Sequence, residues 1–333
     1  MTAVVLTTEG GGQGPVFTSA SFLPGRGLML ERLTARLPGR GFFDVVDGGP
    51  TAPQDEFGND AFSYGGAFLI PYANRIRGRP GPGRTIETEI AGKTVRLPAN
   101  WSGKAPGAER YAMHGLILRT AVEIVSRQDD RVRARLLAGD FEDHWLSSTE
   151  LTFDFRLAPT RLSIEITAVN VGRERMPIGI GWHPYFHLPS GDRRQAVLHM
   201  PAERRLEVDN YDAVLPTGEI APVVGTPYDF AVGEGRVLGD LYLDDCFVDL
   251  HGPGPVATIR DAAGGMTLTL EAGGPVSAVQ VYAPADKAFV TVEPQFNWAD
   301  PFGAVWPEGT DTGMVWLEPG DSTQYVVNLT IRV

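Results

Sequence analysis

The sequence predicts an all-β protein built from antiparallel strands. Short segments alternate apolar and polar residues along most of the chain, and 40 glycines and 26 prolines interrupt its 333 residues throughout. These interruptions leave little room for long helices. No helical repeats separate the strand-like segments, as a parallel sheet would require. Because the segments continue without a compositional break, we expect one domain over residues 1–333.

A β-hairpin is the clearest predicted element. Apolar residues occupy every second position from Leu151 to Leu157 and again from Leu162 to Ile166, with Ala-Pro-Thr between the two runs. This alternation is typical of half-buried strands joined by a turn. Further strand-like segments span residues 115–126, 131–139, 266–272, 278–284, 288–294 and 324–333. Residues 50–66 and 97–113 are long for connections in a compact domain, and such loops are often functional.

Charge and cysteine content exclude several classes of function. The formal net charge of -12 disfavours binding to nucleic acid or to anionic membrane surfaces. The single cysteine, Cys246, excludes an internal disulfide framework and a cysteine-rich zinc site. The N-terminal residues lack a basic region followed by an apolar one, and no apolar run approaches the roughly 18 residues of a membrane span. We therefore expect a cytoplasmic protein.

The common catalytic motifs are absent from the sequence. It contains no phosphate loop ending in Gly-Lys-Ser/Thr, no Gly-x-Ser-x-Gly elbow and no His-Glu-x-x-His pair. His183 and His187 would share one face only in a helix, which Pro184 disfavours. We therefore expect no metal site and favour proton transfer, for which histidine and a tuned carboxylate are suited.

The residues suited to proton transfer also have structural interpretations. His183 lies in the aromatic segment 178–191 and could be a hydrogen-bonded core histidine. Asp244 and Asp245 interrupt a strand-like run, and adjacent strand residues face opposite ways. Glu293 follows an apolar segment, where it could be a site residue or a surface residue at a strand end. A cluster of arginines could bind an anion or be solvated in a loop; it comprises Arg75, Arg77, Arg79 and Arg84.

Short segments along nearly the whole chain together resemble the aldose 1-epimerase, or galactose mutarotase, family. Their order and spread carry the resemblance. The segments are Asn-Arg-Ile from Asn74, His-Gly from His114, HPYFHL from His183, PTGE from Pro216, GTPYDF from Gly225, LDDCF from Leu243, VYAPADKAFVTVEPQ from Val281 and LEPGDS from Leu317. The resemblance implies a large antiparallel β-supersandwich with a sugar pocket on one concave sheet face.

The same resemblance implies an isomerase that interconverts the α and β anomers of a free sugar without a cofactor. Glu293 would be the general base on the C1 hydroxyl, and His183 the general acid that protonates the ring oxygen. The implied substrate-binding residues are His114, Arg75, Asp244, Asn74 and Gln295. His187 matches no catalytic position and is interpreted either as structural or as a residue that supports the catalytic side chains without contacting substrate.

Two departures from the family pattern leave the substrate open. Asp245 stands where many relatives have histidine, and Leu116 follows His114-Gly115 where relatives often have a second glycine. A hexose-6-phosphate 1-epimerase is one alternative, because the arginine cluster and Arg119 could hold a phosphate. A non-catalytic carbohydrate-binding or sensing protein is another. The expected partner is a small sugar, and the sequence leaves monomer and homodimer both open.

Overall fold

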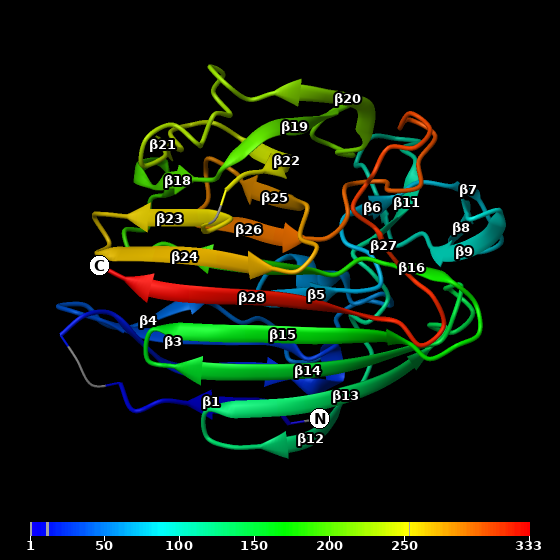
Figure 1. Cartoon of the computed structure of the whole chain (residues 1–333). Coiled ribbons are helices and arrows are strands. Elements are labelled where there is room, and N and C mark those ends of the chain that lie inside the picture. The colour runs from blue at the N-terminus through cyan, green and yellow to red at the C-terminus, as the bar shows by residue number, and fades with distance from the viewer. Residues whose placement is uncertain (1, 11–12, 253) are drawn as a thin grey trace.

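Two large antiparallel sheets lie face to face and contain most of the strands (Figure 1). The structure is a computed structural model that describes residues 2–10, 13–252 and 254–333. All strand pairings recorded within these ranges are antiparallel, and helical structure there is limited to η1 (Pro24–Arg26), η2 (Asn59–Phe62) and η3 (Arg193–Gln195). The all-β, antiparallel prediction is confirmed.

The larger sheet has 11 strands. In spatial order these are β1 (Val4–Thr7), β2 (Val16–Leu23), β3 (Met29–Leu37), β4 (Gly41–Val46), β17 (Gly181–His187), β26 (Phe289–Gln295), β25 (Ala278–Ala283), β22 (Leu243–Leu250), β19 (Ala202–Val208) and β20 (Pro216–Pro222), while β5 (Gly66–Leu69) pairs with β17 and β3.

The second large sheet has nine strands and forms the front layer in Figure 1. Their order is β12 (Glu123–Arg127), β13 (Arg131–Gly139), β14 (Thr149–Ala158), β15 (Arg161–Asn170), β28 (Ser322–Arg332), β24 (Met266–Gly273), β23 (Ala257–Asp261), β18 (Val197–His199) and β21 (Arg236–Val237).

Three small sheets complete the described strands. They are β10 (Trp101–Ser102), β11 (Arg110–Met113) and β6 (Arg75–Ile76); β7 (Arg79–Pro80), β8 (Thr85–Ile90) and β9 (Lys93–Pro98); and β16 (Met176–Ile178) with β27 (Val315–Leu317). None of the helices in the described ranges is long and apolar enough to cross a membrane.

Aromatic side chains between the two large sheets fix their relative position. The ring of Phe155 on β14 lies 5.0 Å from Phe22 on β2 and 5.1 Å from Phe68 on β5. Burial of such rings provides a large hydrophobic stabilisation. The hydroxyl of Tyr325 on β28 donates to the carbonyl of Pro294 on β26 at 2.7 Å. The nine-stranded sheet therefore packs against β26.

Most strand-like segments form strands, but residues 115–126 do not. The hairpin is β14 and β15, and Leu157 lies opposite Leu162 as the alternation predicts. In the segment 115–126, strand structure begins only at Glu123. Before that point the backbone turns on itself through a hydrogen bond from Thr120 N–H to the carbonyl of Ile117 at 2.9 Å. Apolar periodicity alone does not distinguish such a packed loop from a strand.

Candidate active site

Four neighbouring strands of the larger sheet contribute to a cavity of about 600 Å³. β17, β26, β25 and β22 supply His183, Glu293, Gln280 and Asp244 to its lining. This volume falls within the range of roughly 300–1,000 Å³ that is usual for small-molecule sites.

The strand register explains why residues distant in sequence meet there. The β17–β26 pairing places His183 opposite Glu293, midway between the paired positions at Gly181 and Tyr185. Glu293 is in turn opposite Gln280 on β25. Directly opposed residues on one sheet face have neighbouring side chains, so an imidazole, a carboxylate and an amide form one row across three strands.

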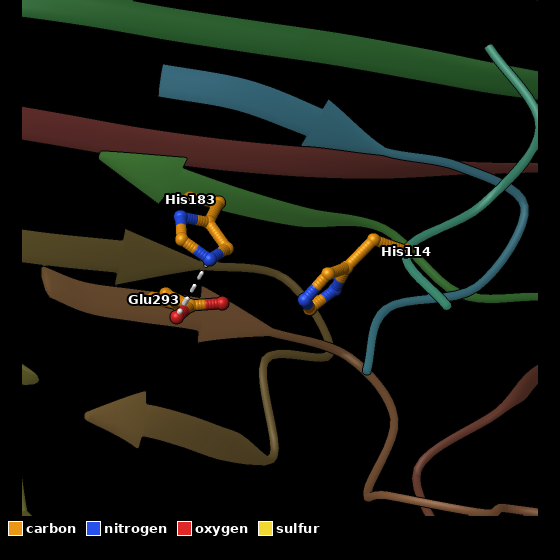
Figure 2. A group of neighbouring side chains, drawn as sticks. All are labelled: His114, His183 and Glu293. Atoms are coloured by element: carbon orange, nitrogen blue, oxygen red, sulfur yellow. Dashed lines mark ion pairs between the residues drawn. The ribbon is translucent and has the colours of Figure 1, made fainter. Parts of the chain in front are cut away.

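The side chains of His183 and Glu293 point toward each other, and His114 approaches from a loop (Figure 2). His183 Nε2 lies 3.4 Å from Glu293 Oε1, and the two side chains are only 6% and 1% exposed. The rings of His114 and His183 are 5.2 Å apart and nearly perpendicular. The distance between His183 and Glu293 is long for a hydrogen bond.

Burial drives the pKa values of His183 and Glu293 in opposite directions. It lowers the pKa of His183 to about 4, with a smaller effect in the same direction from Arg75. It raises the pKa of Glu293 well above its ordinary value, with a further rise from Asp244 that Arg75 opposes. Burial also lowers the pKa of His114 well below its ordinary value. Burial therefore disfavours the charged form of both side chains, a perturbation that is frequent at functional sites.

Strands β6 and β11 position the remaining polar groups above the sheet. Met113 on β11 lies opposite Arg75 on β6, and His114 N–H donates to the carbonyl of Asn74 at 2.9 Å. Asn74 and His114 have φ values of 59° and 60°. Such left-handed conformations are uncommon for residues other than glycine, and they often occur at functional sites.

A closed ring of four side chains holds Arg75 and Asp244 in place. Arg75 donates to Asn74 Oδ1 at 3.0 Å, Asn74 donates to Gln280 Oε1 at 2.9 Å, and Gln280 donates to Asp244 Oδ1 at 2.7 Å. An ion pair of 3.7 Å between Arg75 and Asp244 completes the ring. The groups are thus oriented before a ligand arrives, which lowers the cost of binding.

Some polar atoms at this site have no partner within the described ranges. Arg75 Nε, His114 Nδ1 and Glu293 Oε2 are buried and lack a hydrogen bond there. Buried polar atoms are normally satisfied, so those without a partner need an explanation. Arg75, His114 and Glu293 therefore keep unused hydrogen-bonding capacity beside the cavity.

The structure brings five of the seven predicted site residues to the cavity. These are His183, Glu293, His114, Arg75 and Asp244. The other two, Asn74 and Gln295, are fully buried and do not line it. Asn74 acts through the ring of side chains described above, and Gln295 donates to the carbonyl of Asn297 at 2.8 Å. His187 also lies outside the lining, against Phe289.

Several lining residues were not singled out from the sequence. Gln280 was detectable as a polar residue within the apolar strand-like segment 278–284. The long loops 50–66 and 97–113 contribute Phe62 and Trp101, among others. Their length was a signal of function, but it did not indicate which side chains would face a ligand.

The arginine cluster does not gather at the cavity. Arg75 is its one member in the lining. Arg77 binds Glu109 at 2.7 Å, Arg84 binds Glu56 at 2.6 Å, and Arg79 lies 4.0 Å from Glu89. These exposed ion pairs fit the solvated-loop interpretation, and Arg119 likewise donates to the backbone of Glu56.

His114, His183 and Glu293 also have the composition of a metal site. One ligand atom from each lies within 4.8 Å of the others. Two imidazoles and a carboxylate suit several divalent transition metals, but Arg75 places a positive charge beside this group. The expectation that no metal is needed stays a prediction.

A second cavity, of about 710 Å³, lies beside residues 115–121. Its titratable lining residues Glu56, Arg119 and Glu142 are exposed, and His144 is partly exposed. It therefore does not share the buried acid–base chemistry of the first cavity, and we take the cavity over β17 and β26 as the candidate active site.

Comparisons with known proteins identify the family of the chain. A family model described as aldose 1-epimerase matches residues 35–330. The chain belongs to the aldose 1-epimerase family. Family members are sugar epimerases and mutarotases, and the resemblance seen in the sequence is confirmed.

Solved structures of the aldose 1-epimerase type share the fold over nearly the whole chain. A putative aldose 1-epimerase from Escherichia coli K12 is 19% identical, with a TM-score of 0.71 and 99% of both chains covered. An aldose epimerase homologue from Caenorhabditis elegans is 22% identical, with a TM-score of 0.74, and the match covers 99% of this chain and 98% of that one. These likenesses establish the galactose mutarotase-like fold.

Sequence relatives in the same family are distant. A maltose epimerase from Levilactobacillus brevis is 28% identical over 211 residues, which are 59% of each protein, so the match spans less than two thirds of that relative. An uncharacterized Escherichia coli protein, YphB, is 28% identical over 271 residues, which are 79% of this chain and 82% of YphB.

Proposed function

We propose that the protein is an aldose 1-epimerase that interconverts the α and β anomers of an unphosphorylated aldose. The observation that carries this proposal is the contact of 3.4 Å between His183 Nε2 and Glu293 Oε1 at the lining of a cavity of about 600 Å³. Family membership supports sugar isomerisation. The maltose epimerase relative is named for a sugar with a free anomeric carbon.

In the proposed reaction the pair carries one proton. With Glu293 ionised and His183 protonated, the carboxylate takes the proton of the C1 hydroxyl and the imidazolium protonates the ring oxygen. The ring opens to the aldehyde. Rotation about the C1–C2 bond presents the other carbonyl face, and the reverse transfers close the ring as the other anomer.

The opposed pKa shifts define the resting protonation state of the pair in this cycle. In the free protein they favour protonated Glu293 and neutral His183, which is the state that the pair reaches after ring opening. Transfer of one proton between the two groups restores the state required for opening. Because ring closure starts from the protonation state that ring opening produces, one site serves both directions.

Arg75, Asp244 and His114 would hold the sugar hydroxyls while the ring opens. The ring of four side chains fixes the first two, and the strained turn at His114 aims its imidazole at the same space. A substrate held in one orientation keeps its anomeric centre against the pair during bond rotation.

Anomer exchange measured by polarimetry or NMR tests the proposal directly. We expect the protein to accelerate the mutarotation of at least one freshly dissolved sugar relative to buffer alone. The sugars to test are α-D-glucose, α-D-galactose, L-arabinose and D-xylose. Calorimetric sugar binding without any acceleration would instead indicate a non-catalytic carbohydrate-binding protein.

A further inference from the structure

The long loop 50–66 places a phenylalanine against the two histidines of the candidate active site. Phe62, the last residue of η2, lines the same cavity as His114 and His183. The centre of its ring lies 4.7 Å from that of His114, edge to face, and 6.2 Å from that of His183, with only 30° between the two ring planes. Phe62 is 8% exposed. One apolar side chain therefore covers both imidazoles on the side of this loop.

Arg26 anchors this loop from the interior of the protein. It ends η1, and its side chain is completely buried. The guanidinium binds both carboxylate oxygens of Asp60 at 3.0 Å each. It also donates to the carbonyl of Pro50 at 3.1 Å and to the hydroxyl of Tyr64. A planar guanidinium that holds a carboxylate through two bonds fixes its orientation, so Arg26 ties the middle of the loop to both of its ends.

Two further contacts tie η2 to the strands that supply the histidines. The side-chain amide of Asn59 donates to the carbonyl of Asn100 at 2.7 Å, and the side-chain amide of Asn100 binds both the N–H and the carbonyl of Met113. Met113 directly precedes His114. At the other end of η2, the carbonyl of its last residue accepts from the hydroxyl of Tyr185 on β17. The loop is thus fixed relative to both imidazoles.

Phe62 is the apolar member of the surroundings of His183. Titratable or charged groups face this imidazole from the other elements, namely Glu293 on β26, Arg75 on β6, His114 after β11 and Tyr185 on β17. Water in place of the Phe62 ring would solvate a charged imidazole and would compete with the carboxylate of Glu293 for hydrogen bonds. The burial that lowers the pKa of His183 therefore depends in part on this ring.

We propose that Phe62 keeps water away from the proton transfers of His183 and Glu293, and that Arg26 is a positioning residue that acts through Asp60. This inference rests on the proposed function and adds residues to its site. Exclusion of water strengthens the electrostatic interactions of the pair with a bound sugar. Phe62 supplies this exclusion only while η2 stays in place, and the ion pair between Arg26 and Asp60 holds it there.

An NMR titration of the histidines tests the inference without any sugar. The chain has six histidines, and in protein with isotope-labelled histidine the His183 resonance is identified by its absence in His183→Asn. In the wild type it should titrate near pH 4. In Phe62→Ala its pKa should rise by about one unit or more toward 6.5, because water reaches the imidazole. Phe62→Leu keeps an apolar side chain in this place, so its titration should stay near that of the wild type.

Rates of anomer exchange provide a second readout. The probe is whichever of α-D-glucose, α-D-galactose, L-arabinose and D-xylose the wild type accelerates most. Phe62→Ala should lower kcat roughly tenfold, and the acidic limb of its pH profile should move upward with the pKa of His183. Asp60→Asn removes the charge that Arg26 binds, so it should change kcat and the acidic limb in the same direction by a smaller amount.

Phe57→Ala is the matched control. Phe57 belongs to the same loop but lines the second cavity, where the guanidinium of Arg84 lies 4.5 Å from the centre of its ring. This variant should leave both kcat and the titration of His183 unchanged.

The outcomes separate this inference from the proposed function. A wild-type titration of His183 in folded Phe62→Ala, or a rise in KM with kcat unchanged, would overturn the inference and leave the proposed function intact. A wild-type His183 that titrates near pH 6.5 would also overturn it. Unchanged behaviour of folded Asp60→Asn would exclude Arg26 as a positioning residue. If the wild type accelerates no sugar, the proposed function fails whatever the titration shows.

Discussion

Burial shifts the pKa values of His183 and Glu293 in opposite directions, while Nε2 of one lies 3.4 Å from Oε1 of the other. Between the lowered pKa of the imidazole and the raised pKa of the carboxyl, the two groups together hold one proton. A pair in this state always contains one donor and one acceptor, which is what reversible ring opening requires.

The first prediction is a bell-shaped pH profile of kcat/KM. As pH falls toward about 4, His183 becomes protonated while Glu293 is already protonated, so the pair loses its proton acceptor. As pH rises above the raised pKa of Glu293, both groups are deprotonated and the pair loses its donor. Initial rates corrected for spontaneous mutarotation at each pH provide the measurement. A flat profile from pH 4 to pH 10 would contradict the assignment.

Removal of either member of the pair should slow epimerisation strongly. We expect Glu293→Gln and His183→Asn each to lower kcat by ~10²-fold or more, in line with general acid–base contributions. His187→Asn is a matched control on the same strand, because His187 lies outside the cavity lining. Its rate should stay near that of the wild type. Rates near wild type in both site variants would exclude the proposed roles.

Arg75 should matter for sugar binding, whereas the other members of the arginine cluster should not. Arg75→Gln opens the ring of four side chains and leaves Asp244 without its ion pair, so we expect KM to rise roughly tenfold or more. Arg77→Gln and Arg84→Gln remove only exposed ion pairs with Glu109 and Glu56. Steady-state kinetics with D-glucose and D-glucose 6-phosphate provide the test. If the wild type strongly prefers D-glucose 6-phosphate, and if Arg77→Gln or Arg84→Gln abolishes this preference, the hexose-6-phosphate alternative would be favoured.

The strands were predictable from the sequence because sheet faces impose a period of two on apolar residues. The hairpin from Leu151 to Ile166 follows this rule, whereas β26 (Phe289–Gln295) is buried on both faces. The pairing of β17 with β26 was not predictable in this way. Register between strands distant in sequence depends on tertiary packing, so periodicity could not show that His183 lies opposite Glu293.

The candidate site was predictable where a residue type stands out in its segment. Asp244 and Glu293 interrupt apolar runs, and His183 lies among aromatic residues. Asn74 and Gln295 occur in equally suggestive segments, yet their amides bond to neighbouring protein groups instead of lining the cavity. Sequence context shows that a polar residue is unusual in its segment. Only side-chain geometry shows whether its hydrogen-bonding groups face a cavity or bond to other protein groups.

The lowered pKa of His183 also predicts a pH dependence of stability. The unfolded state binds the proton near pH 6.5 and the folded state only near pH 4, so folding is penalised as pH falls through this window. The penalty reaches about 3 kcal/mol at pH 4. His183→Asn lacks this titration. The difference in the free energy of unfolding between this variant and the wild type should therefore shift in favour of the variant by about 3 kcal/mol when the pH is lowered from 7.5 to 4. Urea denaturation at both pH values measures the change, and a constant difference would argue against a buried neutral imidazole.

Gly115 should be essential to the loop that carries His114. Its φ is 81°, and a Cβ atom there would clash with the backbone of Ile70.

Gly92, in the turn between β8 and β9, is the matched control. It has a φ of 74°, and a Cβ atom added there would meet no other atom within 4 Å. Gly92→Ala therefore reports the cost of the left-handed conformation alone, about 1 kcal/mol. Gly115→Ala adds the clash and should lower the free energy of unfolding by about 3 kcal/mol or more. It should also slow epimerisation, since His114 is displaced. Equal urea midpoints for the two variants would show that the loop relaxes freely, and that the position of His114 does not depend on its contact with Ile70.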